Sequence, residues 1–359
     1  MSTSVQTRKI IFNPCENPEN KYVSIVVNGL AKRGYQISGL EHFLTSISHF
    51  NSIKLVHLNW FENLDDQSRK SMWISYFRKT VVLTLIRLTG KKLVWTMHNR
   101  LSHEKKSGKL SRKLTQKIIK QADAIVIHSN FSRAILLNQS PTIAAKIIHI
   151  PHPDFVDVYG PTISDEAKIR VNRLQLLFLG AIKPYKNIEL LIDAMKPFSD
   201  TVHLTIAGNP NSITYKDELM RLAADSTNIT LDLGFIPNEK LPKYLHQADL
   251  LVLPYSLESS LNSGTVLLAF SYGRTVISPR IGTIDDLKNE EDVFTYSYSD
   301  ETEHLEILKA QIQKALNIYL ENPDSLLEKG LKMKNLVSQQ NQKEMVINAF
   351  DKLYQDLLN

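Results

Sequence analysis

Hydrophobic residues in this chain gather in short runs, and between the runs they recur at helical spacing. The runs are nearly continuous and rich in Ile, Val and Leu, which is typical of strands buried on both faces of a parallel sheet. They lie at residues 8–14, 52–60, 91–98, 122–129 and 145–153, and again at 174–180, 202–208, 229–235, 248–255 and 274–279. Helices are predicted at residues 22–35, 187–198, 215–225, 238–247 and 264–273, followed by a polar helical tail from about residue 301. The alternation of strands and helices predicts an α/β fold.

The pattern stops and restarts once, which indicates two domains. Residues 153–173 lack strong periodicity and contain Gly160 and Pro161, so we place the linker there. We expect two Rossmann-like, doubly wound parallel-sheet domains that face a cleft, at residues 1–158 and 159–340. In such sheets ligands bind beyond the carboxyl ends of the strands, so the residues that directly follow each strand are the candidates for chemistry.

The charge is distributed unevenly. The formal net charge is +6, yet residues 67–120 hold fifteen Lys or Arg and a single acid, leaving 28 basic and 36 acidic residues elsewhere. This region is either a set of solvated helix faces or a surface that meets anionic lipid. Nucleic acid is not expected as a partner, because no binding motif or interleaved aromatic platform is found.

Composition also bounds the location. The only cysteine, Cys15, excludes an intrachain disulfide and fits a reducing compartment. No signal segment opens the chain, and no apolar run approaches the roughly 20 residues that span a bilayer. We therefore expect a soluble or peripheral protein.

Two strand ends in the second half have residues that suit an anion. Gly180 closes one strand, and Lys183 and Lys186 follow it around a Pro-Tyr turn, just before a helix. Two lysines there can clamp a diphosphate, although exposed loop lysines are the simpler reading. After residues 248–255, the sequence Ser263-Gly264-Thr265 opens a helix whose free N–H groups can bind a phosphate. A plain cap on a core helix is the alternative.

Other nucleotide-binding signals are weaker or missing. The segment Phe235–Ile236–Pro237 can hold a planar base through backbone contacts, or it is a buried loop. The chain contains neither the GxxxxGK[ST] nor the GxGxxG motif.

In the first half, His98 directly follows a strand, and His103 and Glu104 lie in the next loop. A histidine there is a natural general base, because its usual pKa lies near neutrality; a structural histidine is the alternative. A metal site is not expected, since His98 and His103 are five residues apart and no Cys cluster supports them. No GxSxG motif supports a catalytic triad.

These blocks, in this order, resemble the nucleotide-sugar glycosyltransferases of the GT-B fold, group 1 or family 4-like, over nearly the whole chain. "LFLGAIKPYKNIELLIDAM" is similar to their donor turn, and "LGFIPNEKLPKYLHQADLLVLPY" followed by "SGTVLLAFSYGRTVISPRIGT" is similar to their nucleotide-binding core. By this resemblance, the last helix, at residues 341–359, crosses back to the N-terminal domain.

The sequence departs from the large retaining family 4 at its carboxylates. The two glutamates of that family correspond here to Ser260 and Leu268, and its donor-loop arginine corresponds to Ala181. "HLNW", "WTMHNRLSHE", "IKPYKN" and "LNSGT" resemble instead a subgroup of bacterial exopolysaccharide enzymes related to xanthan-type β-mannosyltransferases.

The resemblance implies a metal-independent, inverting transferase without a cofactor. It would move a hexose from a GDP- or UDP-sugar to a glycan or a polyprenyl-diphosphate-linked glycan, in bacterial surface polysaccharide synthesis. His98, or else His103 or Glu104, would take the acceptor proton. The donor-binding residues would be Gly180, Lys183, Lys186, Phe235, Ile236, Glu258, Ser263, Gly264 and Thr265. Region 67–120 would dock on an anionic membrane, making the protein cytoplasmic and peripheral at the inner face of the cytoplasmic membrane.

Three alternatives stay open. The first is a retaining transferase of the same fold, which the anomeric configuration of the product would distinguish. The second is a non-catalytic partner subunit, suggested by Ala181, Ser260 and Leu268. The third is an epimerase, which needs several acids at the strand ends; we find none there.

Overall fold

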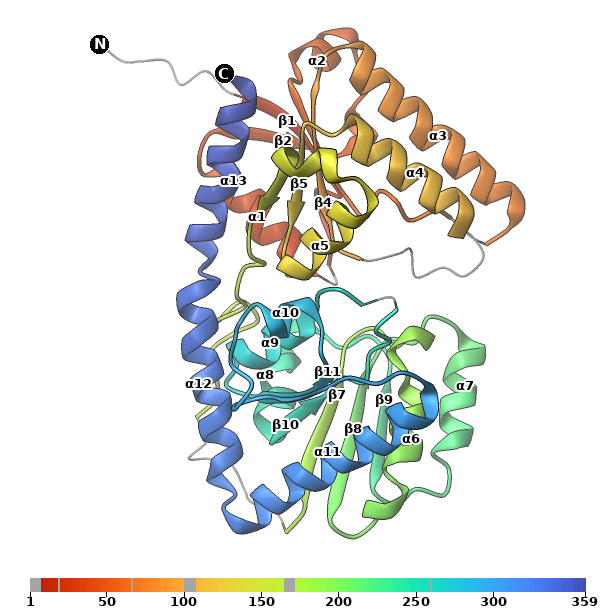
Figure 1. Cartoon of the computed structure of the whole chain (residues 1–359), viewed down its shortest axis with the longest axis vertical. Coiled ribbons are helices and arrows are strands. Elements are labelled where there is room, and N and C mark those ends of the chain that lie inside the picture. Colours follow the sequence, from red (N-terminus) through yellow and green to blue (C-terminus); the bar gives the residue numbers. More distant parts are fainter. Residues whose placement is uncertain (1–7, 19, 66, 100–107, 165–171, 259) are drawn as a thin grey trace. The chain divides into compact units, whose positions relative to one another are not determined.

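The protein is described by a computed structural model that covers residues 8–18, 20–65, 67–99, 108–164, 172–258 and 260–359 (Figure 1). It forms two compact units. The first unit comprises Met1–Pro153 and Asn341–Asn359, and the second unit comprises Asp154–Gln340. The division falls five residues before the expected one, because Phe155 and Tyr159 already bond Ser271 and Tyr272 of the second unit.

The first unit is built on six parallel strands in the order β2-β1-β3-β4-β5-β6. The order reverses between β1 and β3, as in the doubly wound sheet of flavodoxin, here with a sixth strand. Strand β2 was not predicted, because four residues directly after a helix give too short an apolar pattern. Strand β6 is shorter than predicted, since a 3₁₀ helix takes up its first residues. The strands are β1 (Arg8–Asn13), β2 (Tyr35–Ser38), β3 (Leu55–Asn59), β4 (Lys92–Met97), β5 (Ala124–Ile127) and β6 (Ile147–His149).

The predicted helix at residues 22–35 ends earlier than expected. It stops at Ala31, and Gly34, at φ 87°, turns the chain into β2. A left-handed residue at that point favours glycine. The helices of this unit are α1 (Lys21–Ala31), α2 (Ile47–Ser52), α3 (Arg69–Leu88), α4 (Gly108–Gln121), α5 (Asn130–Gln139) and α13 (Lys343–Leu358), with 3₁₀ turns at Leu40–His42 and Pro141–Lys146.

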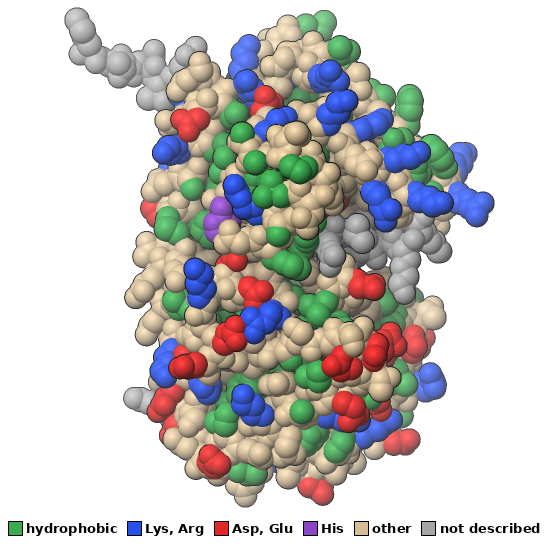
Figure 2. Space-filling model, in the orientation of Figure 1, with side chains coloured by type: hydrophobic (Ala, Val, Ile, Leu, Met, Phe, Trp, Pro, Cys, Tyr) green, Lys and Arg blue, Asp and Glu red, His purple; other side chains and the backbone are tan. Residues whose placement is uncertain are grey.

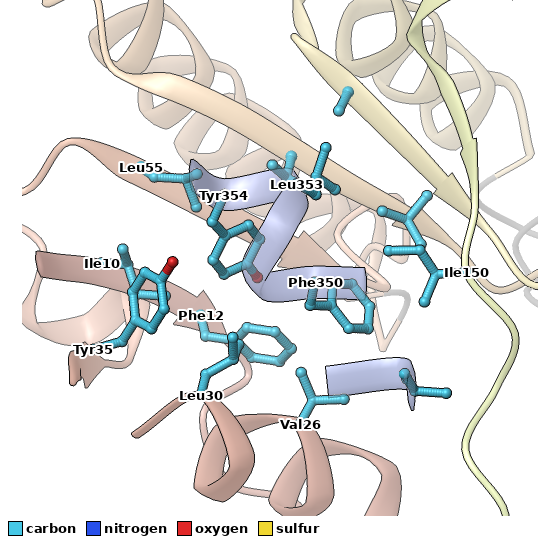
Figure 3. Packing of buried hydrophobic residues seen from close by; sticks show 14 of the residues in the cluster. Ile10, Phe12, Val26, Leu30, Tyr35, Leu55, Ile150, Phe350, Leu353 and Tyr354 are labelled. Atoms are coloured by element: carbon cyan, nitrogen blue, oxygen red, sulfur yellow. The ribbon is translucent and has the colours of Figure 1, made fainter. Parts of the chain in front are cut away.

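The last helix, α13, completes the core of the first unit. Phe350, Leu353 and Tyr354 on α13 enter the same apolar cluster as Phe12 of β1 and Leu30 of α1 (Figure 3). All of these side chains are buried. The core of this unit is therefore assembled from the two ends of the described chain.

The second unit has the strand order β12-β11-β10-β7-β8-β9, all parallel, which is the order of dinucleotide-binding Rossmann sheets. Its switch point lies between β7 and β10. The three residues of β12 were too few to be predicted. The strands are β7 (Leu174–Leu179), β8 (Val202–Gly208), β9 (Ile229–Leu233), β10 (Leu250–Val252), β11 (Thr275–Pro279) and β12 (Phe294–Tyr296).

Helix α9, just after the switch point, is held by close backbone packing. Helix α12 packs against it, and a Cβ on Gly330 of α12 would overlap the carbonyl oxygen of Gly273. The helices are α6 (Ile188–Ala194), α7 (Ile213–Leu222), α8 (Leu241–Gln247), α9 (Gly264–Ser271), α10 (Gly282–Asp285), α11 (Glu301–Glu321) and α12 (Asp324–Gln340), with 3₁₀ turns at Pro184–Lys186, Lys196–Phe198 and Asn238–Lys240. Within the described ranges, none of the helices combines the length and apolarity needed to cross a bilayer.

Candidate functional site

The switch point of the second sheet brings three of the predicted donor residues together. Gly180 follows β7 at φ 127°, and a Cβ placed on it would lie 3.4 Å from both the Lys186 ammonium and the Thr265 hydroxyl. A Cβ on Gly208, which ends β8, would overlap the Gly180 carbonyl oxygen. Glycine at both positions therefore lets the two turns touch and leaves Lys186 and Thr265 on either side of bare backbone.

Lys186 is a buried cation. Its ammonium lies 5.6 Å from the centroid of the Phe178 ring and 5.5 Å from that of the Tyr255 ring. Burial, and secondarily the charge of Lys183, lowers the pKa of Lys186 to about 8. In the described part of the chain no carboxylate pairs with it. A buried charge without a counter-charge is unfavourable, so the position suits an anionic ligand.

The loop between β10 and α9 is held by its hydroxyl groups. The Ser263 side chain accepts a hydrogen bond from the Val266 N–H at 3.2 Å and lies 3.0 Å from the Tyr255 hydroxyl. The Ser263 N–H donates to the Thr283 hydroxyl at 2.9 Å. Ser263 is thus the N-cap of α9. The backbone N–H groups of Gly264 and Thr265, in the first turn of the helix, are the groups that could bind an anion.

The remaining donor candidates are spread more widely. Lys183 is exposed, Phe235 is 61% exposed and Ile236 is half-buried. Glu258 is exposed and lies near Tyr298, whose hydroxyl accepts from the Leu257 N–H. None of the contacts described joins Phe235, Ile236 or Glu258 to Lys186.

In the first unit, aromatic and histidine side chains gather at the carboxyl ends of the strands. Trp60, directly after β3, stacks on His98, directly after β4, with 4.0 Å between ring centroids and 16° between planes. His128 follows β5 and its ring centroid lies 5.1 Å from that of His98. His152 follows β6, and its ring centroid lies 5.5 Å from that of His128. Tyr22 of α1 lies against the rings of all three histidines. We call these five residues the histidine cluster.

His98 is held in its neutral form. Its Nε2 lies 3.0 Å from the Asn59 side-chain oxygen, and the residue is 7% exposed. Burial, with smaller contributions from His128 and His152, holds the pKa of His98 well below its usual value. A neutral imidazole at neutral pH is free to accept a proton.

His57 lies deeper in the sheet and serves a structural role. One ring nitrogen bonds the Tyr354 hydroxyl of α13 and the other lies 2.6 Å from the Thr96 hydroxyl of β4. Burial lowers the pKa of His57 to about 3. The residue thus connects β3 to β4 and to α13 in neutral form.

The histidines that surround His98 were not predicted as its neighbours. His128 donates from Nδ1 to the Ile150 carbonyl at 2.8 Å, and its buried Nε2 has no hydrogen-bond partner among the described residues. His152 donates from Nδ1 to the Pro153 carbonyl at 2.8 Å. The signal was present, since both histidines lie near the ends of predicted strands, as His98 does.

Two predicted residues cannot be placed. His103 and Glu104 lie outside the described residues, so His98 is the catalytic candidate with a defined position. Among the residues that the structure describes, no three His, Cys, Asp or Glu side chains form a group that could hold a metal ion.

Comparison with known proteins shows which family and which solved structures the chain is similar to. Residues 173–314 match the family described as glycosyl transferases group 1. The fold is similar to that of Anabaena HepE, solved with UDP and glucose, at a TM-score of 0.71 and 14% identity, covering 97% of this chain and 100% of that one. A glycosyltransferase from Rickettsia africae has a TM-score of 0.66 at 14% identity, covering 99% of both chains. The chain therefore has the GT-B fold, and its residues 173–314 are similar to the group 1 glycosyltransferases.

Two curated proteins are also similar to part of the chain. Two Xanthomonas campestris proteins named GDP-mannose:glycolipid 4-beta-D-mannosyltransferase are 28% and 27% identical over 229 and 227 residues. Each alignment covers 63% of this chain and 61% of the relative, so the match spans less than two thirds of the relatives' length. These relatives are β-mannosyltransferases by name, as in the subgroup that the motifs around His98 and Ser263 resemble.

Proposed function

We propose that the protein is a hexosyltransferase that moves a hexose from a nucleotide-sugar to a glycan or lipid-linked glycan. The observation that carries the proposal is the convergence of Gly180, Lys186 and Thr265 at the switch point of the second sheet. A buried lysine facing bare backbone suits the diphosphate of a nucleotide-sugar. The Xanthomonas relatives are named for GDP-mannose and HepE was solved with UDP, so GDP- and UDP-sugars are the donors to test.

On the donor side, the lysines stabilise the leaving group. The bond between the anomeric carbon and the diphosphate oxygen breaks, and its electron pair leaves with the nucleoside diphosphate. Lys186 and Lys183, with the backbone of Gly264 and Thr265, offset the charge that develops there. We infer that this positive charge takes the role that a metal ion has in other transferases, and that no cofactor is required.

On the acceptor side, His98 is the proposed base. The acceptor hydroxyl oxygen forms the new bond to the anomeric carbon, and its proton passes to His98. Attack opposite the leaving nucleotide inverts the anomeric carbon, giving a β-linkage from an α-linked donor. The missing carboxylates at Ser260 and Leu268 and the relatives' 4-beta-D names support inversion. A retaining transferase would instead give the α-linked product.

Donor binding and nucleotide release test the proposal. Purified protein is given UDP-, GDP- and dTDP-sugars in EDTA with a lipid-linked glycan extract, and thermal stability and nucleotide release are measured. One donor should stabilise the wild type and release nucleotide, and Lys186→Ala should weaken its binding roughly 10- to 100-fold, as loss of a charged hydrogen bond does. Lys196→Ala, an exposed lysine paired with Asp193 in the same unit, is the matched control.

The test also separates the non-catalytic alternative, which Ala181, Ser260 and Leu268 favour. If a donor stabilises the protein but no nucleotide is released with any acceptor preparation, the chain is a binding subunit. If no donor stabilises it, the donor-site assignment is wrong.

We further propose that helices α3 and α4 dock the first unit on an anionic membrane. Helix α3 exposes five large apolar side chains, between 40% and 77% exposed: Trp73, Ile74, Phe77, Val81 and Leu88. At about 100° per residue they fall within an arc of about 100°, roughly opposite the buried Leu83 and Ile86. We call them the α3 stripe.

Arginines border this stripe. By the same helical spacing, Arg69 and Arg87 lie along one side and Arg78 along the other. Neither α3 nor α4 contains an acidic residue, and Lys and Arg side chains gather over these helices (Figure 2). An apolar stripe between cations suits the boundary between headgroups and acyl chains, where each cation near the surface contributes about 1 kcal/mol. A glycolipid acceptor would be presented on the same surface.

Vesicle sedimentation tests the membrane proposal. Wild type should bind vesicles containing phosphatidylglycerol, bind pure phosphatidylcholine weakly, and show a blue shift of Trp73 emission on binding. Phe77→Glu should weaken binding at least roughly tenfold, since burial of one aromatic side chain is lost. Ile213→Glu, an equally exposed apolar position in the second unit, should not. Equal binding by wild type and Phe77→Glu would contradict insertion.

A further inference from the structure

The side chain of Asn59, the last residue of β3, lies between the backbone carbonyl of Asn13 and the His98 ring. It is 1% exposed, so its amide has no access to bulk water. Its Nδ2 donates to the Asn13 carbonyl of β1 at 3.3 Å, and its Oδ1 lies 3.0 Å from Nε2 of His98. A backbone carbonyl only accepts hydrogen bonds, so the amide nitrogen must face Asn13. The amide oxygen consequently faces the histidine.

This orientation determines which nitrogen of His98 carries the proton. An amide oxygen only accepts, so Nε2 of His98 must be the protonated nitrogen that donates to it. In a neutral imidazole the lone pair then lies on Nδ1. The Trp60 ring, stacked at 4.0 Å on the imidazole, fixes the plane of the ring.

We propose that Asn59 is a positioning residue that holds His98 in the tautomer whose Nδ1 takes the acceptor proton. The inference rests on the proposed function, in which His98 is the base. In the transfer step the hydroxyl proton moves to Nδ1 as the hydroxyl oxygen bonds the anomeric carbon. Nε2 keeps its proton and its hydrogen bond, so the imidazolium that forms still faces the negative end of the Asn59 amide.

The surroundings of His98 make this contact decisive. Among the described residues, the titratable groups that face it are His128 and His152, which follow β5 and β6, His57 of β3 and Tyr22 of α1. Burial keeps His57, His128 and His152 neutral near pH 7 and raises the pKa of Tyr22, so none of these groups places a charge beside the ring at that pH. Asn59→Asp would put a carboxylate there, whereas Asn59→Leu would remove the acceptor.

The first experiment reads the tautomer without turnover. Long-range ¹H–¹⁵N spectra of ¹⁵N-histidine-labelled full-length protein distinguish protonated Nδ1 from protonated Nε2, and His98→Ala assigns the signal. Wild type should show His98 protonated at Nε2, and Asn59→Leu should lose this single form. Protonation at Nδ1 in the wild type, or an unchanged spectrum in Asn59→Leu, overturns the proposal whatever the protein catalyses.

The second experiment reads the pH profile. With whichever of GDP-mannose or UDP-glucose the wild type turns over, Asn59→Leu should lower kcat roughly 10- to 100-fold at unchanged donor KM, part of the contribution of a general base. Asn59→Asp keeps the tautomer and adds a carboxylate, so it should retain activity while the acid limb of kcat/KM moves to higher pH. The control is Asn348→Asp, at an exposed asparagine of α13 that bonds Arg33. It adds the same charge and should leave the acid limb of the pH profile unchanged.

The outcomes separate the two levels of the inference. If His98→Ala retains full turnover, His98 is not the base and the proposed mechanism fails. If His98→Ala is inactive while the Asn59→Asp profile superimposes on that of Asn348→Asp, the mechanism stands and the role of Asn59 is wrong.

Discussion

The two units share a βαβ architecture and differ in what they place at the carboxyl ends of their strands. The first unit collects neutral histidines and aromatic rings, and the second places a buried cation beside bare glycine backbone. In both units burial favours the neutral form of a basic side chain. It lowers the pKa of His98 well below its usual value and that of Lys186 to about 8. Lys186 nevertheless stays mostly charged at neutral pH. Burial therefore leaves a neutral imidazole in the first unit, which is the proposed proton acceptor, and a charged lysine in the second unit, which is the proposed anion site.

The difference follows from how far the usual pKa of each side chain lies from neutral pH. A histidine titrates close to neutral pH, so moderate burial is enough to discharge it. A lysine starts about four pH units higher and needs a much larger shift before it loses its proton near pH 7. Burial alone thus sorts the two side chains into two chemical roles.

The strongest way to break this comparison is to remove the base. We expect His98→Ala to lower kcat roughly 10²- to 10⁴-fold, the contribution of a general base, with donor affinity unchanged. Steady-state kinetics and donor-induced thermal shift measure the two quantities separately. Loss of donor binding in this variant would contradict the proposal that the second unit binds the donor and the first unit supplies the base.

A second prediction concerns pH and stability. Burial lowers the pKa of His57 and His128 to about 3 and that of His152 to about 4, below the usual 6.5. Because the folded-state pKa values are depressed, the folded protein has its full stability well above pH 6.5, where each histidine is neutral whether the protein is folded or unfolded. Stability is lost as the pH falls below 6.5, toward about 4 for His152 and about 3 for His57 and His128. Each histidine should cost about 1 kcal/mol of unfolding free energy at pH 5.5.

Tryptophan fluorescence measures that loss selectively. Trp60, Trp73 and Trp95 all lie in the first unit, so urea unfolding followed by their emission reports that unit. The midpoint should fall between pH 7 and pH 5.5, and His57→Gln should reduce the dependence. A midpoint that is independent of pH would mean that the cluster is not held neutral.

The smallest expected effect comes from the hydrogen bond between His57 and Tyr354. Tyr354→Phe removes the hydroxyl that bonds His57 and should lower the stability of the first unit by about 1 kcal/mol, as loss of one neutral hydrogen bond does. Donor affinity should not change, because the donor residues belong to the second unit. The same urea titration, with a donor-induced thermal shift as control, measures both.

Much of the fold was predictable because buried parallel strands are continuous apolar runs. Strands β2 and β12 were not predicted, because their four and three residues are too few to show a period. His98 was found by its place after a strand. His128 and His152 follow strands as well, but a pattern does not say which of several strand ends converge.

The donor residues show the same limit. That Lys186 and Thr265 flank Gly180 depends on β7 and β10 being neighbours, which is a property of the sheet order and not of either motif. Ser263 was open to two readings, a phosphate ligand or a cap, and the contacts to Val266 and Thr283 show that it caps α9. The orientation of Asn59 depends on β1, β3 and β4 together and has no local signature.

The place of α13 in the first core has a consequence for synthesis. Residues 343–358 are translated after the whole of the second unit, yet Phe350 and Tyr354 complete the core around Phe12. At roughly 5–20 residues per second, the ribosome makes the first sheet on the order of ten to forty seconds before that helix exists. The second unit, contiguous in the chain, can close during this interval. The core of the first unit can therefore close only after the chain of the second unit has been made, and until then its apolar face around Phe12 lacks the side chains of α13.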